Sequence, residues 1–326
     1  MRRSLKMALV AALFFAAAMG LATAAAPAKD DAVAVVNGVA IPQSDLLRLM
    51  VNVQLDAQQD GHRLTQEEIV AWRHKILDQL IGNELLYQEA KKARLTVDPA
   101  VVRQYVAAAK SRFPSDVEFK RALAKKQLTE EILTREVERD TLVRMYLSQR
   151  FLKAATPAEA VVRKYYDDHP DKWREVRARH ILVKVDPKVP ASKAAARKKI
   201  DDLAARVRKG EDFANLARQY SDCPSKERGG DLGYFIKEQM VPRFSAAAFA
   251  LSPGQVSGVV ETEFGYHIIK VEDKRTISYD QVKAAITKEI QDQKMEELAA
   301  AHVADLRKRA RIEILLTDTP PAPAKK

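Results

Sequence analysis

One strand-like segment near residue 315 limits the folds that this sequence can adopt. The residues "RIEILL" (311–316) alternate as a strand does and follow a single long helical pattern. A lone strand is not stable in water, so it needs a partner elsewhere in the chain. The segment "AVAVVNGVAI" (32–41) predicts a hairpin around Asn37-Gly38, a pair that suits a tight turn. We therefore expect residues 311–316 to pair with this hairpin.

The pattern between these two segments changes twice. Residues 30–155 are mostly helical, with a capping box at Thr65 and Glu68 and a further helix start at Thr129. A connecting helix is expected within residues 156–172. Residues 173–275 then mix strand and helix patterns and predict an antiparallel sheet. Residues 276–317 return to one long helix and the final strand. The fold class is therefore α+β, with a sheet-containing block inserted into a discontinuous, mainly α-helical domain.

The first residues have the pattern of an export signal. Arg2 and Arg3 precede an apolar run, and "ATA" at 22–24 has the small-x-small pattern of a cleavage site. We expect a signal peptide over residues 1–24 and a periplasmic mature protein. The uncharged stretch 7–26 is also just long enough to span a bilayer, so an uncleaved inner-membrane anchor is the alternative. Residues 318–326, "TPPAPAKK" with the preceding Asp318, are expected to be disordered.

The formal net charge of +11 is spread along the helices, not gathered into one motif. Nucleic-acid binders of the common kinds interleave basic with aromatic residues, and that pattern is not found here. We expect no nucleic-acid partner. The sequence sets no oligomeric state.

Two histidines and the single cysteine fall within the α+β block. His180 and His267 lie in predicted strands of the same small sheet, and Cys223 lies in a turn between them. Three chemistries could use such a set: a Cys-His nucleophile pair, a zinc site, or a hydrogen-bonded histidine pair that shapes a pocket. Cys223 precedes Pro224 and does not open a helix, and the close-spaced ligand pair of a structural zinc site is absent from the sequence. No metal and no cofactor are therefore expected.

Four segments of this block carry a resemblance to a known family. They are "RARHILVK" (177–184), "FANLARQYSDCPSKERGGDLGYF" (213–235), "MVPRFSAAAFAL" (240–251) and "GQVSGVVETEFGYHIIKVED" (254–273). In order and spacing they resemble the parvulin-type peptidyl-prolyl cis/trans isomerases. The segments "VAVVNGVAIPQSDL" (33–46) and "KILDQLIGNELLYQEAKKARL" (75–95) are similar, more loosely, to exported chaperone-isomerases of the SurA and PrsA type.

The resemblance implies roles for eight residues. His180 and His267 would form the central histidine pair, with Thr262 beside His267 and Cys223 facing the substrate carbonyl. An apolar pocket would receive the proline ring. Its residues would be Leu232, Met240 and Phe244, with Phe235 at the border. The loop after the first strand lacks the arginine pair of phosphate-selective parvulins and offers only Lys184 and Lys188. No phosphorylated substrate is therefore expected to be required.

The resemblance implies an exported isomerase that binds unfolded or newly secreted polypeptides and catalyses rotation of their Xaa-Pro bonds. The helical domain would add chaperone activity, and clients that lie close to a membrane are compatible with this function. The alternative is a holdase chaperone whose parvulin domain only binds peptide.

Overall fold

The structure is a computed structural model that describes residues 31–186 and 188–317. The signal peptide expected at 1–24 and the disordered tail expected at 318–326 lie outside the described residues. The chain divides into two compact units. One unit contains the residues up to Thr156 together with those from Gln291 onward, and the other is Pro157–Ile290. Helix α10 (Tyr279–Arg309) contributes residues to both units.

The first unit combines five helices and a small antiparallel sheet with the last part of α10. The strand order of the sheet is β2-β1-β7. The elements are β1 (Ala32–Val36), β2 (Val39–Pro42), α1 (Gln43–Gln59), α2 (Gln66–Lys92), α3 (Pro99–Lys110), α4 (Asp116–Lys125), α5 (Glu130–Ala155) and β7 (Ile312–Ile314).

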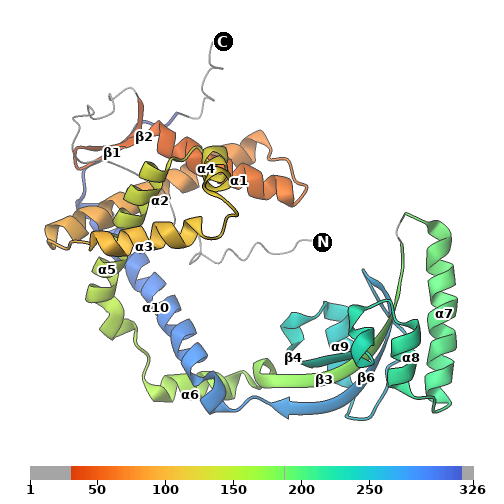
Figure 1. Cartoon of the computed structure of the whole chain (residues 1–326). Coiled ribbons are helices and arrows are strands. Elements are labelled where there is room, and N and C mark those ends of the chain that lie inside the picture. The colour runs from red at the N-terminus through yellow and green to blue at the C-terminus, as the bar shows by residue number, and fades with distance from the viewer. Residues whose placement is uncertain (1–30, 187, 318–326) are drawn as a thin grey trace. The chain divides into compact units, whose positions relative to one another are not determined.

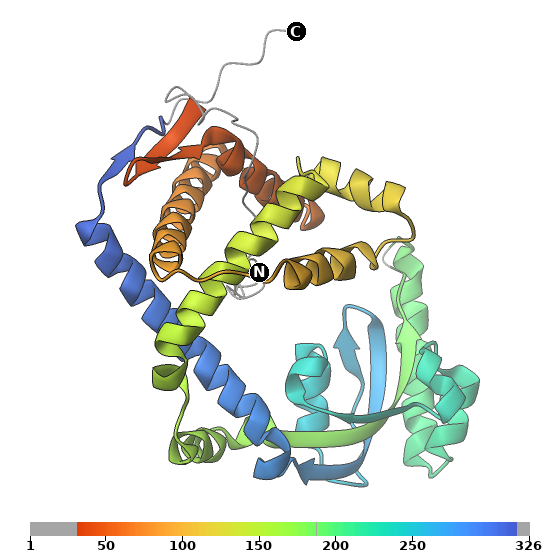
Figure 2. The same cartoon turned by 60° about the vertical axis from the view of Figure 1, so that its left-hand side comes forward.

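The expected pairing of the two distant strand segments is confirmed. β1 and β2 form a hairpin whose turn residues Asn37 and Gly38 have φ values of 52° and 86°, as a tight two-residue turn requires. β7 pairs antiparallel with β1, with Val36 opposite Ile312. The Asn37 side chain strengthens this pairing, because its Oδ1 accepts a hydrogen bond of 2.9 Å from the backbone N–H of Arg311. Figure 2 shows the hairpin and β7 lying side by side.

The helices of this unit begin where the sequence predicted. Thr65 accepts a hydrogen bond from the backbone N–H of Glu68, whose carboxylate in turn accepts one from the backbone N–H of Thr65. Thr129 caps α5 with a single hydrogen bond, which its side chain accepts from the N–H of Ile132. The main core joins α1, α2 and α5 to the hairpin, through Leu46 and Ile81 among others. Among the described residues, no helix has the length and apolar character that a membrane crossing requires.

The second unit is built on a four-stranded antiparallel sheet with strand order β4-β3-β6-β5. The long pair β3–β6 forms its centre (Figure 1). The elements are α6 (Glu159–Asp168), η2 (Pro170–Trp173), β3 (Arg174–Lys184), α7 (Pro190–Arg208), α8 (Phe213–Tyr220), η3 (Pro224–Arg228), β4 (Asp231–Phe235), η4 (Lys237–Gln239), α9 (Pro242–Ala250), β5 (Val260–Thr262) and β6 (Gly265–Thr276). This antiparallel sheet with surrounding helices confirms the predicted α+β class.

Each face of the sheet is covered by different helices. Because successive strand residues point to opposite faces, Ile268 and Ile269 of β6 enter two separate cores. Ile268 packs with Ile181 against α7 and α8. Ile269 packs with Val176 against α9 on the other face. The α9 face carries the two histidines and therefore positions the site.

The first unit also contains a buried ionic cluster. Arg48 of α1 lies between two carboxylates, with its Nη2 atom 3.0 Å from Asp45 Oδ1 and 2.9 Å from Glu136 Oε1. Glu136 is fully buried. Burial raises the pKa of Glu136 to about 8, with Arg48 opposing the rise and Asp45 adding to it. Burial also raises the pKa of Asp45. One arginine thus compensates two buried acids only in part.

This cluster predicts a pH-dependent stability. The raised pKa of Glu136 means that the folded state binds more protons than the unfolded state between pH 4.5 and about 8. Stability should therefore fall as pH rises through this window, by up to about tenfold in the unfolding constant per pH unit. The neutral variant Glu136→Gln should lose that slope. Urea unfolding at pH 5, 6.5 and 8 measures it, with Glu138→Gln, exposed on the same helix, as the control. Equal slopes in all three proteins would contradict the prediction.

Candidate active site

The two histidines meet on the α9 face of the sheet. In the β3–β6 register His180 lies opposite Ile269 and His267 lies opposite Leu182, so the histidines are diagonal neighbours. Their rings stack at 21° with centroids 5.4 Å apart, and their Nδ1 atoms lie 3.2 Å apart. One Nδ1 must carry the hydrogen and the other must accept it. The pair is thus joined by one hydrogen bond inside the protein, where both side chains are about 95% buried.

The outer ring nitrogens extend this bond into a chain of four side chains. His180 Nε2 lies 3.2 Å from Ser225 Oγ, and His267 Nε2 lies 2.8 Å from Thr262 Oγ1. All four ring nitrogens therefore have partners. Neither histidine has Cys223 Sγ as a hydrogen-bond partner among the described residues. This geometry favours the hydrogen-bonded pair over a Cys-His nucleophile.

The hydrogen bonds of this chain can run in either of two directions. If Ser225 donates to His180, then His180 donates to His267 and His267 donates to Thr262. Thr262 Oγ1 also accepts from the backbone N–H of Phe264, at 3.2 Å. In this direction the hydroxyl hydrogen of Thr262 remains free to donate outward. In the opposite direction Thr262 gives that hydrogen to His267.

Burial keeps the pair uncharged. It lowers the pKa of His180 to about 4 and that of His267 to about 4, and His180 lowers the latter further. Both rings are therefore neutral at neutral pH. A neutral pair holds polar groups in place without introducing a charge into an apolar site.

The apolar side of the site comes from α9 and β4. Phe244 lies near the start of α9, where Pro242 occupies the first helical position. Its ring meets both histidine rings edge-on, with centroids 5.6 Å from His180 and 5.4 Å from His267. Phe235, Leu232 and Met240 belong to the same apolar cluster. Phe235 and Phe244 are fully buried, whereas Leu232 and Met240 keep partial exposure.

The segment Ser221–Gly230 runs along the outer edge of β3 and delivers Ser225. Ser221 Oγ accepts hydrogen bonds from the N–H groups of Leu182 and Cys223, at 3.0 and 3.3 Å. Gly230 O accepts one from the N–H of His180, at 3.0 Å. A Cβ at Gly230 would lie 2.3 Å from His180 O, so only glycine allows this approach.

The structure brings seven of the eight predicted residues into contact or into one cluster. These are His180, His267, Thr262, Leu232, Phe235, Met240 and Phe244. Cys223 is a half-buried free thiol at the N-cap of the short 3-10 helix η3, where the sequence analysis expected a turn and no helix start. Its place opposite a substrate carbonyl stays a prediction. The sequence analysis missed Ser225. Its only signal was a hydroxyl two residues after Cys223, in the same turn.

Comparison with known families agrees with this site. The family model of the PPIC-type PPIASE domain matches residues 180–273, which include both histidines, Ser225 and Thr262. The SurA-like N-terminal domain matches residues 1–147. The chain is thus a peptidyl-prolyl cis/trans isomerase of the parvulin type joined to a SurA-like chaperone part, as the resemblance implied.

Relatives extend this match to most of the chain. The foldase protein PrsA of Caldanaerobacter subterraneus subsp. tengcongensis is 34% identical over 242 residues, covering 74% of this chain and 70% of the relative. PrsA of Bacillus subtilis is 31% identical and covers 77% of this chain and 72% of the relative. The crystal structure of the peptidylprolyl isomerase PrsA from Bacillus anthracis is 28% identical and covers 72% of this chain and 96% of that chain, with a TM-score of 0.35.

On the sequence relatives, this chain belongs to the PrsA family of foldases. As a foldase it acts on unfolded polypeptides.

The low pKa values of the histidines predict the pH response of the site. Below pH 6.5 His180 and His267 become protonated in the unfolded state, whereas in the folded state the buried rings stay neutral down to about pH 4. The stability of this unit should therefore be constant above pH 6.5 and fall towards pH 4, by about tenfold in the unfolding constant per pH unit for each histidine. Isomerase activity should stay level from pH 8 to about 5.

NMR titration of the histidine ring carbons measures both values directly. Titration of His180 or His267 near pH 6.5 in the folded protein would contradict the prediction.

Proposed function

We propose that this protein rotates Xaa-Pro bonds of unphosphorylated polypeptides. The site would be the four hydrogen-bonded side chains Ser225, His180, His267 and Thr262, together with the pocket around Phe244. The observation that carries this proposal is the contact between a neutral, fully hydrogen-bonded polar chain and the edge of an apolar cluster. The site thus offers an apolar surface for a proline ring directly beside groups that can bond the preceding carbonyl.

The chemistry needs no covalent step. Rotation of a peptide bond crosses a barrier of about 18–20 kcal/mol, because planarity gives resonance. Before proline the two isomers are close in energy but exchange over tens of seconds or more. A site that holds the ring in an apolar slot while the carbonyl swings can stabilise the twisted amide selectively. Each 1.4 kcal/mol of such stabilisation gives about tenfold in rate.

Each predicted residue has a role in this proposal. Leu232, Met240 and Phe244 hold the proline ring, and Phe235 supports Phe244 from behind, with ring centroids 6.1 Å apart. Thr262 donates its hydroxyl hydrogen to the moving carbonyl when the hydrogen bonds run from Ser225 towards Thr262. Cys223, a weak donor, faces the same carbonyl. In that direction His180 and His267 connect the Ser225 hydroxyl to the Thr262 hydroxyl, and their buried rings exclude water.

The surroundings support activity without a phosphate on the substrate. Lys193 forms an ion pair with Glu261 at 2.8 Å, and Lys199 lies 3.9 Å from Asp222. The backbone N–H of Lys184 donates to Asp222, which places a carboxylate beside this lysine. Lys193 and Lys199 thus have acidic partners, which makes them less available to a dianionic phosphate.

The helical unit supports the client-binding half of the proposal. Several large apolar side chains on its helices are exposed, among them Tyr105, Val117, Met145 and Leu152. We propose that residues 30–155 and 276–317 hold unfolded segments while residues 173–275 isomerise them, with residues 156–172 as the connection. We also propose that a leader at 1–24 exports the protein to the periplasm, where its clients are newly secreted polypeptides.

Exchange spectroscopy on an unphosphorylated Xaa-Pro peptide tests the pocket. The wild type should accelerate cis/trans exchange, and Met240→Ala with Phe244→Ala should reduce the acceleration at least about tenfold, because the ring then lacks its slot. Val161→Ala with Val189→Ala, two exposed positions of the same unit, is the matched control. Met240→Ala alone changes a half-exposed residue, so it still tests the pocket if replacement of the buried Phe244 prevents folding. A phosphorylated peptide should be no better a substrate.

If the folded wild type gives no exchange above the uncatalysed rate, the catalytic proposal is wrong. Suppression of aggregation of an unfolded client would then support the holdase alternative.

Thr262 provides a second test at the polar side. Thr262→Val keeps the shape of the side chain but removes the hydroxyl, so catalysed exchange should fall about tenfold or more. Thr262→Ser restores the hydroxyl and should retain most of the activity. Peptide affinity, measured by titration, should change much less than the exchange rate in both variants. Equal activity of the valine and serine variants would remove Thr262 from the proposed mechanism.

A further inference from the structure

A cavity lies on the same sheet face as the histidine pair, at the other end of α9. Its volume is about 480 Å³, and it is enclosed by η2, the start of β3, η4, the end of α9 and the end of β6. Val176, which is fully buried, and Phe249 supply its apolar surface. Nothing in the proposed isomerase site uses these residues.

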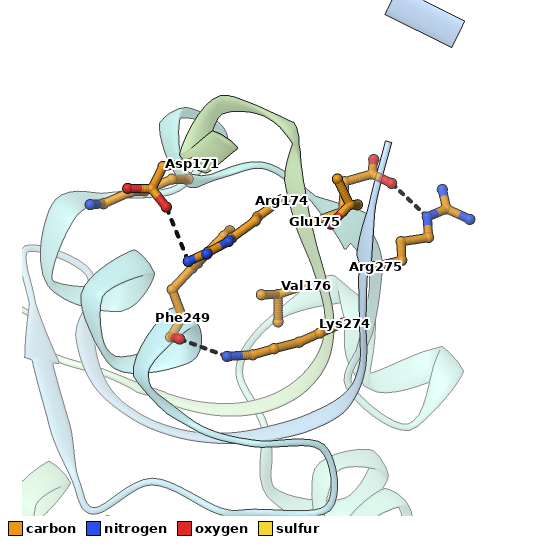
Figure 3. A pocket seen from close by; sticks show the side chains of 9 residues that line it. Asp171, Arg174, Glu175, Val176, Phe249, Lys274 and Arg275 are labelled. Carbon is orange, nitrogen blue, oxygen red and sulfur yellow. Dashed lines mark hydrogen bonds and ion pairs between the residues drawn. The ribbon is translucent and has the colours of Figure 1, made fainter. Parts of the chain in front are cut away.

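The cavity contains more positive than negative charge. Arg174 and Lys274 extend on either side of Val176 towards Phe249 (Figure 3). Lys237 adds a third cation, and its ammonium has no hydrogen-bond or ion-pair partner among the described residues. Asp171 compensates one cation, because it lies 3.0 Å from Arg174. The cavity therefore has two cationic groups in excess.

The other ion pair at the rim does not change this balance. Glu175 and Arg275 are bonded to each other at 2.6 Å. They lie opposite each other in the β3–β6 register, one position along from the pair Val176 and Lys274. Their side chains therefore point to the other side of the strands. The Arg275 guanidinium stacks there on the ring of Tyr234, 3.7 Å from its centroid.

Lys274 keeps donors available to a ligand. Its ammonium donates one hydrogen bond of 2.6 Å to the carbonyl of Phe249, near the end of α9. An ammonium carries three hydrogens, so two remain. Burial and the charge of Arg174 both lower the pKa of Lys274, in agreement with the excess of cationic groups that line the cavity. An anionic group would relieve this imbalance, and an apolar stem would cover Val176 and Phe249.

The cavity and the histidine pair share one surface. Val176, Ala178 and His180 alternate onto the α9 face, and α9 runs between the two sites, with Phe244 at the histidines and Phe249 at the cavity. Val176 and His180 lie four positions apart along β3, or about 13 Å at 3.3 Å per residue. An extended client has the same rise, so one segment of about five residues can reach both sites.

We infer that this cavity binds the side-chain carboxylate of a Glu or Asp residue about four positions from the proline in a client polypeptide. The inference rests on the proposed function, since it places the client at the histidine pair. The occupant is thus an acidic peptide segment, held by Lys237, Lys274 and Arg174.

Matched peptides test this inference with the full chain. Each has one Xaa-Pro bond, acetylated and amidated ends, and either Glu or Gln four positions before or after the proline. The protein is titrated with each peptide, and the change in its backbone amide NMR shifts gives the affinity. With Glu either before or after the proline, but not in both positions, the Glu peptide should bind about three- to fivefold more tightly than the matching Gln peptide at low salt. The difference should disappear at about 1 M salt, where charges are screened. The amides of Val176 and Lys274 should shift with Glu only.

Variants assign the effect to the cavity. Lys237→Gln, at an exposed residue, should lower the ratio of Glu to Gln affinity, and Lys237→Gln with Lys274→Gln should bring it to about one. Lys198→Gln, which removes an exposed charge from α7 on the opposite face, should leave the ratio as in the wild type. Thermal unfolding midpoints identify any variant that is not folded.

Equal affinities for Glu and Gln peptides in both directions, with isomerisation intact, would overturn the inference and leave the proposed function standing. The inference would also be overturned if tighter binding were seen only with a free C-terminal carboxylate at the same spacing. The same holds if Lys198→Gln also removed the tighter binding of the Glu peptide. An absence of catalysed exchange would count against the proposed function alone, because the affinity ratio is measured independently of the rate.

Discussion

The hydrogen bond between the Nδ1 atoms of His180 and His267 is the interaction on which the site depends. Two imidazoles can share one buried position only if they are neutral and if every ring nitrogen finds a partner. That requirement explains why Ser225 and Thr262 lie at the two ends of the chain. The long β3–β6 pairing brings the histidines together, and the segment 221–230 brings Ser225 to them along the part of β3 that extends beyond β4.

Helix α9 organises everything else on this face. It is short, and only a few of its side chains reach the sheet, so each end has a distinct function. Phe244 near its start packs against the histidine rings, while the carbonyl of Phe249 near its end receives the ammonium of Lys274. The same helix therefore separates an apolar pocket beside neutral polar groups from a cavity with excess positive charge. A client in an extended conformation could meet both kinds of surface in turn.

Short-range patterns account for the parts that the sequence analysis predicted. The Asn37-Gly38 turn, the Thr65 capping box and the alternation of β3 each depend on residues a few positions apart. The pairing of β7 with β1 followed from elimination, because the hairpin was the obvious partner for a lone strand. The motifs around His180 and His267 implied the family, and with it the apolar cluster of Leu232, Met240 and Phe244.

The sequence by itself determined the α+β class through local periodicity, and the order and spacing of its motifs implied, by resemblance to the parvulins, the histidine pair and the isomerase activity. The tertiary structure alone decided which hydroxyl bonds His180, how one arginine serves two buried acids, and where unbalanced cations gather. Most of those contacts join residues that are far apart in the sequence, such as Ser225 and His180, 45 positions apart, or Lys237 and the residues at the start of β3 and the end of β6. No local pattern encodes such neighbours, since they are set only when the sheet register and α9 are in place.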